Sequence, residues 1–217
     1  MRGTSALLLW NDYLGGDEQA FHEWYNRRHI PERVPGLPGF LRARRFEALN
    51  GGPKHIALYD LASAAALQSA QYRKLLDNLD PETRHFVPKF GNASKTILSV
   101  FARTGYGEGA VLAAMAFDAD PSLLAKDGCG EHIGRLVERE GIAAAHLFKL
   151  DATAMAGAKP TRPDDLALPW VLLVEAVSPR PLDGLRADNA LGLSPDAIKP
   201  LRAGIFRLSF ANEPIAL

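Results

Sequence analysis

The sequence has 217 residues, 47% of them hydrophobic, and its 25 basic and 25 acidic side chains give a formal net charge of zero. A chain of this length can bury the core of one larger domain or of two small ones. Because the charge is balanced and no basic block or tail is present, nucleic acid and anionic membrane surfaces are disfavoured as partners.

The single cysteine, Cys129, excludes an internal disulfide and a multi-cysteine metal site, and it fits a reducing compartment. The apolar run 6–10 is too short for the core of a signal peptide with a cleavage site. No run approaches the roughly 20 apolar residues of a membrane span. We therefore expect a soluble, cytoplasmic protein.

The first predicted helix carries aromatic side chains and a histidine. It follows a strand-length apolar run at 5–11, begins at a possible N-cap, Asp17, and ends near Ile30, because Pro31 disfavours helical angles before it. Arg28 falls within the apolar face, so either the helix unwinds there or the guanidinium reaches across a pocket mouth to solvent. At about 100° per residue, the face consists of Phe21, Trp24, Tyr25 and His29.

A strand and its hairpin partner are predicted next. The segment 40–49 alternates with period two, and Asn50-Gly51-Gly52-Pro53 is a strong turn signal, so 55–61 should return as the second strand. The alternation predicts one strand face with Phe40, Arg42, Arg44 and Phe46, and another with Leu41, Ala43, Arg45 and Glu47.

An apolar helix is predicted from Ser63 to the stop signal Asp80-Pro81, and an irregular segment around His85 precedes a fourth strand at 96–102. One β-α-β-β-α-β unit is then complete by about residue 104.

The second half is predicted to be a degenerate repeat of the first. Strands are expected at 110–117, 142–150, 170–177 and 205–210, with a helix at 131–140. The spacing of His132-Ile133 from Gly141-Ile142 echoes that of His29-Ile30 from Gly39-Phe40. An internal repeat of about 105 residues implies two domains, 1–104 and 105–217. The Pro- and Ala-rich stretch 154–168 is an insertion between hairpin strands.

Residues 18–47 resemble a known family. The pattern Trp24-Tyr25, His29, Pro31-Glu32, Pro38-Gly39-Phe40 and an arginine-rich strand is similar to the EthD-like group of the dimeric α/β-barrel superfamily. The resemblance implies an α+β fold of two tandem ferredoxin-like β-α-β-β-α-β repeats that form a pseudo-dimeric α/β barrel within one chain, with further homodimerisation open. It also implies chemistry that ranges over monooxygenases, isomerases, cyclases and haem enzymes, so function has to be argued from the site.

His29 is the candidate general acid or base, because the pKa of histidine lies near neutrality. It can equally be a helix-end histidine that interacts with terminal carbonyls. Tyr25 is a candidate donor and Trp24 a candidate pocket wall, although both can be simple core aromatics. Glu32 either orients His29 or pairs with a neighbouring arginine.

Arg42 and Arg44 are candidates for binding a substrate carboxylate or phenolate, because burying them without an anionic partner is costly. The plainer interpretation is that they form ion pairs with glutamates of the other half. His132 is the counterpart of His29 but lacks the surrounding motif, so the second copy is expected to have lost the site.

No metal centre is predicted, since the other histidines show no ligand spacing with Asp, Glu or Cys, and no nucleotide-binding glycine motif or nucleophile elbow is present.

The leading hypothesis is a protein that binds, and in one version converts, a small apolar or aromatic oxygenated compound without a tightly bound cofactor. The reaction can be an isomerisation, cyclisation, decarboxylation or oxygenation. The alternatives are a non-catalytic ligand-binding or stress-associated barrel and a haem-binding barrel, with haem the weakest because only His29 points to it.

Overall fold

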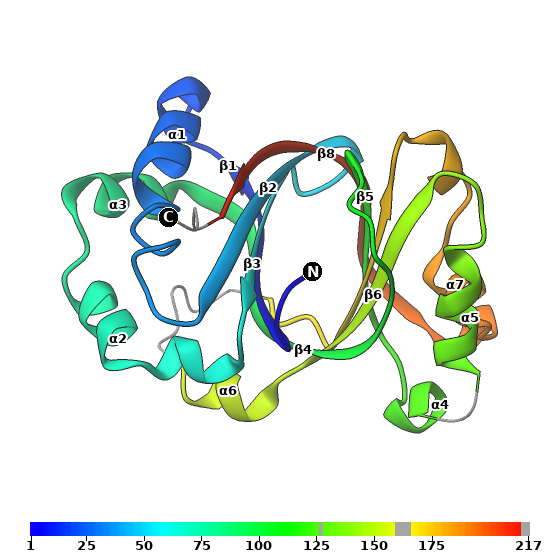
Figure 1. The fold of residues 1–217 in the computed structure, drawn as a ribbon. Helices are drawn as coiled ribbons and strands as arrows, with labels where there is room; N and C mark the ends of the chain where they lie inside the picture. Colours follow the sequence, from blue (N-terminus) through cyan, green and yellow to red (C-terminus); the bar gives the residue numbers. More distant parts are fainter. Residues whose placement is uncertain (126–127, 159–165, 214–217) are drawn as a thin grey trace.

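Eight antiparallel strands close into a barrel in the computed structural model, with helices packed outside it on two opposite sides (Figure 1). The structure describes residues 1–125, 128–158 and 166–213. The strands are β1 (Ser5–Tyr13), β2 (Phe40–Gly51), β3 (His55–Leu61), β4 (Phe90–Gly105), β5 (Val111–Asp118), β6 (Ile142–Leu150), β7 (Trp170–Ala176) and β8 (Lys199–Asn212).

The order of strands around the barrel is β1-β3-β2-β8-β5-β7-β6-β4. The first four strands in sequence are therefore adjacent in the order β4-β1-β3-β2, and the last four in the order β8-β5-β7-β6. Two seams join these groups: β2 pairs with β8, and β4 pairs with β6.

Apolar side chains form three layers. One cluster fills the barrel, and it includes Trp10, Phe46, Phe148 and Phe206. The other two lie between the outer surface of the barrel and the helices of each half. Alternate residues along each strand thus serve the barrel interior and a helix-covered face, as the pleat requires.

The first helix forms where the sequence predicts it. In α1 (Glu18–Trp24), the Asp17 side chain accepts a hydrogen bond from the Ala20 amide at 2.9 Å, which confirms the N-cap. The helix continues as a π-helical turn, η1 (Tyr25–His29), closed by the bond from the Ile30 amide to the Tyr25 carbonyl at 3.0 Å. The wider turn leaves Arg28 exposed, which is how the chain avoids burying that residue.

A bulge in β2 overturns one predicted face. Phe40 pairs with Leu61 of β3, and Arg42 already pairs with Asp60, so one extra residue is inserted between them. Phe40 therefore packs under the helices with Ala43, whereas Phe46 packs inside the barrel. The alternation predicts one common face for Phe40 and Phe46, and that prediction is wrong because the bulge shifts the register.

The single helix predicted from Ser63 is two elements. A 3-10 turn, η2 (Ala64–Gln68), ends at Ser69, whose extended backbone (ψ 149°) interrupts the helix and whose hydroxyl caps α2 (Ala70–Asp77). The segment predicted to be irregular is helical, as α3 (Pro81–Phe86) and η3 (Val87–Lys89), because Asp80 caps it. The fourth strand begins at Phe90, earlier than predicted.

The second half also carries several short helices. They are α4 (Pro121–Ala125), α5 (Cys129–Leu136), α6 (Ala152–Ala156), η4 (Arg180–Leu182), α7 (Ala187–Leu191) and η5 (Pro195–Ala197). The helix predicted at 131–140 is α5, which ends earlier. The insertion predicted at 154–168 lies partly outside the described residues. Among the helices that the structure describes, none is long and apolar enough to cross a membrane.

Candidate functional site

His29 lines a cavity of about 80 Å³ between the helices of the first half and the outer face of its sheet. The pleat of β1, β3 and β4 directs side chains into this layer, and η1, α2 and α3 cover it. Apolar side chains supply most of the wall, and the polar side chains that line it are Asn11, His29, Arg33, Tyr59, Tyr72, Thr83, Ser94 and Lys95.

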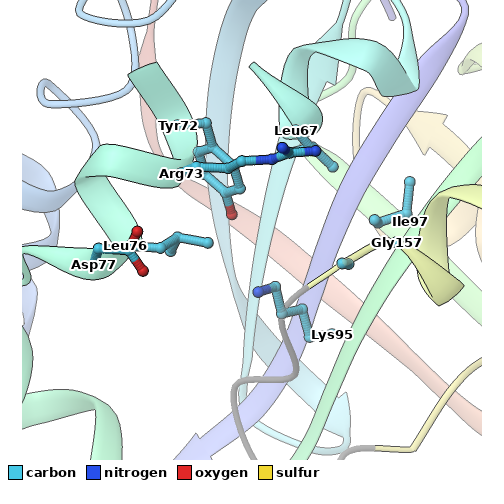
Figure 2. A pocket seen from close by; sticks show the side chains of 9 residues that line it. Leu67, Tyr72, Arg73, Leu76, Asp77, Lys95, Ile97 and Gly157 are labelled. Atoms are coloured by element: carbon cyan, nitrogen blue, oxygen red, sulfur yellow. The ribbon is translucent and has the colours of Figure 1, made fainter. Parts of the chain in front are cut away.

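A second cavity, of about 220 Å³, adjoins the first and shares Tyr72, Leu76 and Lys95 with it. Figure 2 shows α2 side chains on one side of this space, with Lys95, Ile97 and Gly157 on the other. The Tyr72 hydroxyl and the Lys95 ammonium point into it from opposite sides. We call the two spaces the inner and outer chambers. Together they approach the lower size, roughly 300 Å³, of small-molecule pockets.

Aromatic rings hold the imidazole of His29 in place. Its centroid lies 4.6 Å from that of Trp24 and 4.8 Å from that of Tyr25, and Trp24 in turn stacks on Phe86. The side chain is 7% exposed, and Nδ1 has no hydrogen-bond partner among the described residues. A buried ring nitrogen without a partner is uncommon in native proteins, and a role in binding or catalysis is one explanation for it.

The surroundings keep His29 uncharged. Burial lowers its pKa well below the usual value, and the positive charges of Arg33, Arg45 and Lys95 lower that pKa further. At neutral pH the imidazole therefore has a free lone pair. The same cations stabilise any anion that forms beside it.

Arg33 is the buried cation nearest to this histidine in sequence, and it is 4% exposed. Its Nη1 donates to the His29 carbonyl oxygen at 2.6 Å and lies 3.5 Å from Glu32 Oε2. Arg33 also lines the inner chamber. From the sequence, Arg33 is expected only as an ion-pair partner, because no periodicity indicates that the turn after Pro31 folds back over the sheet.

Tyr25, Tyr59 and Arg45 form a group beside the inner chamber. The Arg45 guanidinium lies 4.3 Å from the centre of the Tyr25 ring and donates to Asn26 Oδ1 at 2.8 Å. Burial raises the pKa of both tyrosines, so both hydroxyls stay protonated. Each tyrosine also affects the pKa of the other, although neither hydroxyl forms a hydrogen bond among the described residues. Tyr59 lines the chamber, whereas Tyr25 lies behind it.

The other expected site residues of the helix have plainer surroundings. Trp24 is a core residue, 2% exposed, packed among Phe21, Phe86 and His29. Glu32 is partly exposed and lies beside Arg33, and burial raises its pKa. The ion pair with a neighbouring arginine is thus the contact that the structure gives Glu32.

Arg42 and Arg44 line neither chamber. Arg42 binds Glu108 through Nη2 and Oε2 at 2.6 Å and lies 3.0 Å from Glu213. Arg44 Nη1 donates to Glu175 Oε2 at 2.9 Å. Both arginines therefore pair with glutamates of the second half, and the structure does not group them with the chamber. In the second half, His132 lies in α5 with its ring against Gly192.

Tyr59, Tyr72 and Lys95 were not singled out as ligand-binding residues by the sequence. Tyr72 falls within the apolar helix that is predicted to begin at Ser63. Lys95 lies just before the predicted strand 96–102, but β4 starts at Phe90 and so includes Lys95. The alternation of β3 is the one signal that could have placed Tyr59 on this face.

Comparison with known proteins identifies the fold. No family model matches the sequence, and no curated protein matches it. Among solved structures, an anthrone oxidase-like protein is similar with a TM-score of 0.68 at 10% identity, over 98% of this chain and 94% of that one. A chlorite dismutase-like protein has a TM-score of 0.58 at 15% identity, over 97% and 96% of the two chains.

A haem-binding protein from Thermus thermophilus is also similar, with a TM-score of 0.51 at 7% identity over 96% of this chain and 92% of that one. At these identities the likeness concerns the fold. The chain has a mixed α+β fold with a closed antiparallel barrel, like the dimeric α/β-barrel proteins.

Proposed function

We propose that the two chambers bind a small, mostly apolar or aromatic oxygenated compound and that His29 removes a proton from it. The observation that carries this proposal is an uncharged imidazole, with no partner for its Nδ1 among the described residues, at an apolar cavity that Arg33 and Lys95 also line. General bases need such a lone pair at working pH, and buried cations are suited to an anion that develops during reaction.

The roles of the residues follow from their positions. His29 takes a proton from an acidic carbon or a phenol of the substrate. The resulting carbanion or phenolate is stabilised by Arg33 and Lys95, and the hydroxyls of Tyr59 and Tyr72 are placed to donate hydrogen bonds to its oxygen. Trp24 and Tyr25 hold the imidazole rather than the substrate.

Isomerisation, cyclisation, decarboxylation and oxygenation can all begin from such an anion. Oxygenation is the version that we favour, because a structurally similar protein is described as anthrone oxidase-like. In that version, O₂ oxidises a CH₂ group of the substrate anion to a carbonyl, and the second oxygen atom leaves as water.

The test uses purified protein with a panel of anthrones, phenols and aromatic acids. Binding is followed by calorimetry, O₂ consumption by an electrode and products by mass spectrometry. His29→Gln, which keeps much of the side-chain volume, should lower kcat/KM by about 100-fold or more while the Kd changes little. His85→Gln is the matched control, since His85 is an exposed histidine on α3. Full turnover by His29→Gln would refute the role of His29.

The second candidate is a non-catalytic ligand-binding barrel. It is favoured by the enclosure of the imidazole, which is 7% exposed and packed against two rings. This candidate predicts saturable binding by the wild type without any product. The same titration and product analysis therefore separate the two candidates.

Haem does not fit at His29. The ring lies against Trp24 and Tyr25, and the inner chamber of about 80 Å³ is far smaller than a porphyrin. No step of the proposed reaction is therefore assigned to haem.

We further propose that the chain is an EthD-like tandem of ferredoxin-like repeats, divided into domains 1–104 and 105–217, which form a pseudo-dimer and act in the cytoplasm. The repeat is supported by the matching strand orders β4-β1-β3-β2 and β8-β5-β7-β6 and by the two seams between them. Expression of each half alone would test it, since a single repeat should associate into a dimeric barrel.

A further inference from the structure

Two histidines and a glutamate meet beside Phe21, in the first half of the chain. They are His22 of α1, Glu47 of β2 and His55 of β3, and one ligand atom from each lies within 4.8 Å of the others. The imidazole centroids of His22 and His55 are 5.4 Å apart. The histidines are 33 positions apart in sequence, which is why their spacing suggested no metal site.

The backbone fixes this arrangement. Glu47 and His55 are directly paired across the β2–β3 hairpin, so their side chains project from the same face of the sheet. The Asp17 cap sets the start of α1 and places His22 above the hairpin. Glu18 lies one turn before His22 on the same helix face.

His55 lacks the partners that a buried histidine normally has. It is 3% exposed, and neither Nδ1 nor Nε2 forms a hydrogen bond among the described residues. Two unsatisfied ring nitrogens in one buried side chain carry a desolvation cost, and a metal ion bound to one of them would remove part of it. This is the observation that distinguishes the cluster from an incidental group of polar side chains.

Two of the distances are close to those between ligands of one coordination shell, and the ligand atoms of His22, Glu47 and His55 all lie within 4.8 Å of one another. His22 Nε2 lies 3.5 Å from Glu47 Oε1, and His55 Nε2 lies 3.4 Å from Glu18 Oε1. Ligands about 2.0–2.1 Å from a tetrahedral zinc ion are about 3.3 Å from one another. Small rotations of these side chains are therefore enough to enclose an ion.

Two cations and two carboxylates surround the histidines. Arg45 and Lys54 oppose a further positive charge, and Lys54 binds Glu18. The carboxylates of Glu18 and Glu47 offset those two cations.

We propose that His22, Glu47 and His55 form a binding site for a divalent first-row transition-metal ion of the Zn²⁺ type, with Glu18 as a fourth ligand. Two imidazoles with carboxylate suit Zn²⁺, Ni²⁺ or Cu²⁺, whereas Mg²⁺ and Ca²⁺ prefer oxygen ligands throughout. Bound there, the ion ties α1 to the β2–β3 hairpin. It thereby fixes the helix that continues into Tyr25 and His29.

The test uses tag-free, full-length protein stripped with a chelator and titrated calorimetrically with Zn²⁺ and, separately, with Mg²⁺. We expect one equivalent of Zn²⁺ to bind and Mg²⁺ not to compete. His22→Gln and Glu47→Gln should each weaken Zn²⁺ binding by about 100-fold or more, because each removes a direct ligand. These two side chains are partly exposed, so the variants should fold even if His55→Ala does not.

His85→Gln is the control and should bind Zn²⁺ like the wild type. One equivalent of Zn²⁺ should also raise the Tm of the wild type and of His85→Gln but not that of His22→Gln. The proposal is overturned if the stripped protein binds no stoichiometric Zn²⁺, or if His22→Gln and Glu47→Gln bind it unchanged. Neither result depends on turnover at His29.

Discussion

Arg44 of β2 and Glu175 of β7 form an ion pair inside the barrel, with Nη1 2.9 Å from Oε2 and side chains that are 2% and 1% exposed. Glu175 also accepts a hydrogen bond from the Gly109 amide at 3.2 Å, and His146 Nε2 lies 3.6 Å from its other oxygen. The pair connects the two groups of four strands across the interior.

Removing one partner of this pair should be costly. Arg44→Met leaves an unpaired carboxylate in the barrel, and we expect a loss of about 3–5 kcal/mol in the free energy of unfolding. The double variant Arg44→Met/Glu175→Leu should recover most of that loss. Urea denaturation measures both. Arg135→Met, which removes an exposed pair with Glu131, is the control and should cost less than about 1 kcal/mol. A similarly small cost for Arg44→Met would contradict the expectation.

Glu175 should also govern acid stability. Burial alone would raise its pKa, but the contacts with His146, Arg44 and the Gly109 amide outweigh burial and lower the pKa from 4.5 to about 2. Because the folded pKa is depressed, the stabilisation is complete above pH 4.5 and disappears as the pH falls towards 2. We expect about 3 kcal/mol to be lost across that window. The free energy of unfolding, measured by urea denaturation between pH 2 and 5, should depend less steeply on pH for Glu175→Gln than for the wild type. An unchanged pH dependence would assign the effect to other groups.

The charge of Lys95 should affect the pKa of His29, the proposed general base. Its charge contributes to the low pKa of His29, after burial, Arg33 and Arg45. Lys95→Met should therefore raise the pKa of His29, and the acid limb of a rate profile that needs the unprotonated imidazole should move to higher pH. NMR titration of the ring measures the shift directly. Lys149→Met, in β6 of the other half, is the control, and an equal shift there would rule out a local effect.

Two glycines should respond oppositely to alanine. Gly39 has φ +82°, and a Cβ there would lie 2.8 Å from Ala66 Cβ, so Gly39→Ala should destabilise the protein by about 1–2 kcal/mol or more. Gly134 lies within α5, and a Cβ there meets nothing within 4 Å. Gly134→Ala should stabilise by up to about 1 kcal/mol. Thermal unfolding of both variants checks the signs.

Local rules predicted the parts of the fold that depend on local interactions. The Asp17 cap and the turn at 50–53 are properties of a few adjacent residues, and both are found where expected. The aromatic face of the first helix was also correct, since Phe21, Trp24, Tyr25 and His29 are all buried. That face placed His29 beside the core before the cavity was known.

The remainder depends on contacts between distant segments. The extra residue between Phe40 and Arg42 is defined only by the pairing of β2 with β3, so alternation placed Phe40 on the wrong face. Ser69 can cap a helix or continue one, and tertiary packing decides between them. The inner chamber is formed by β1, β3 and β4 together with the turn after Pro31. His22 and His55 come together only because α1 packs on the β2–β3 hairpin.

The seam between β2 and β8 has a consequence for biosynthesis. Ala43 pairs with Asn212 and Gly51 with Gly204, so β2 leaves the ribosome long before the strand that covers its edge. During that interval the backbone amides and carbonyls on one side of β2 are open to any other strand. In a crowded polysome, a neighbouring nascent chain presents the same β8 sequence, and exchange of β8 between copies competes with closure of each barrel.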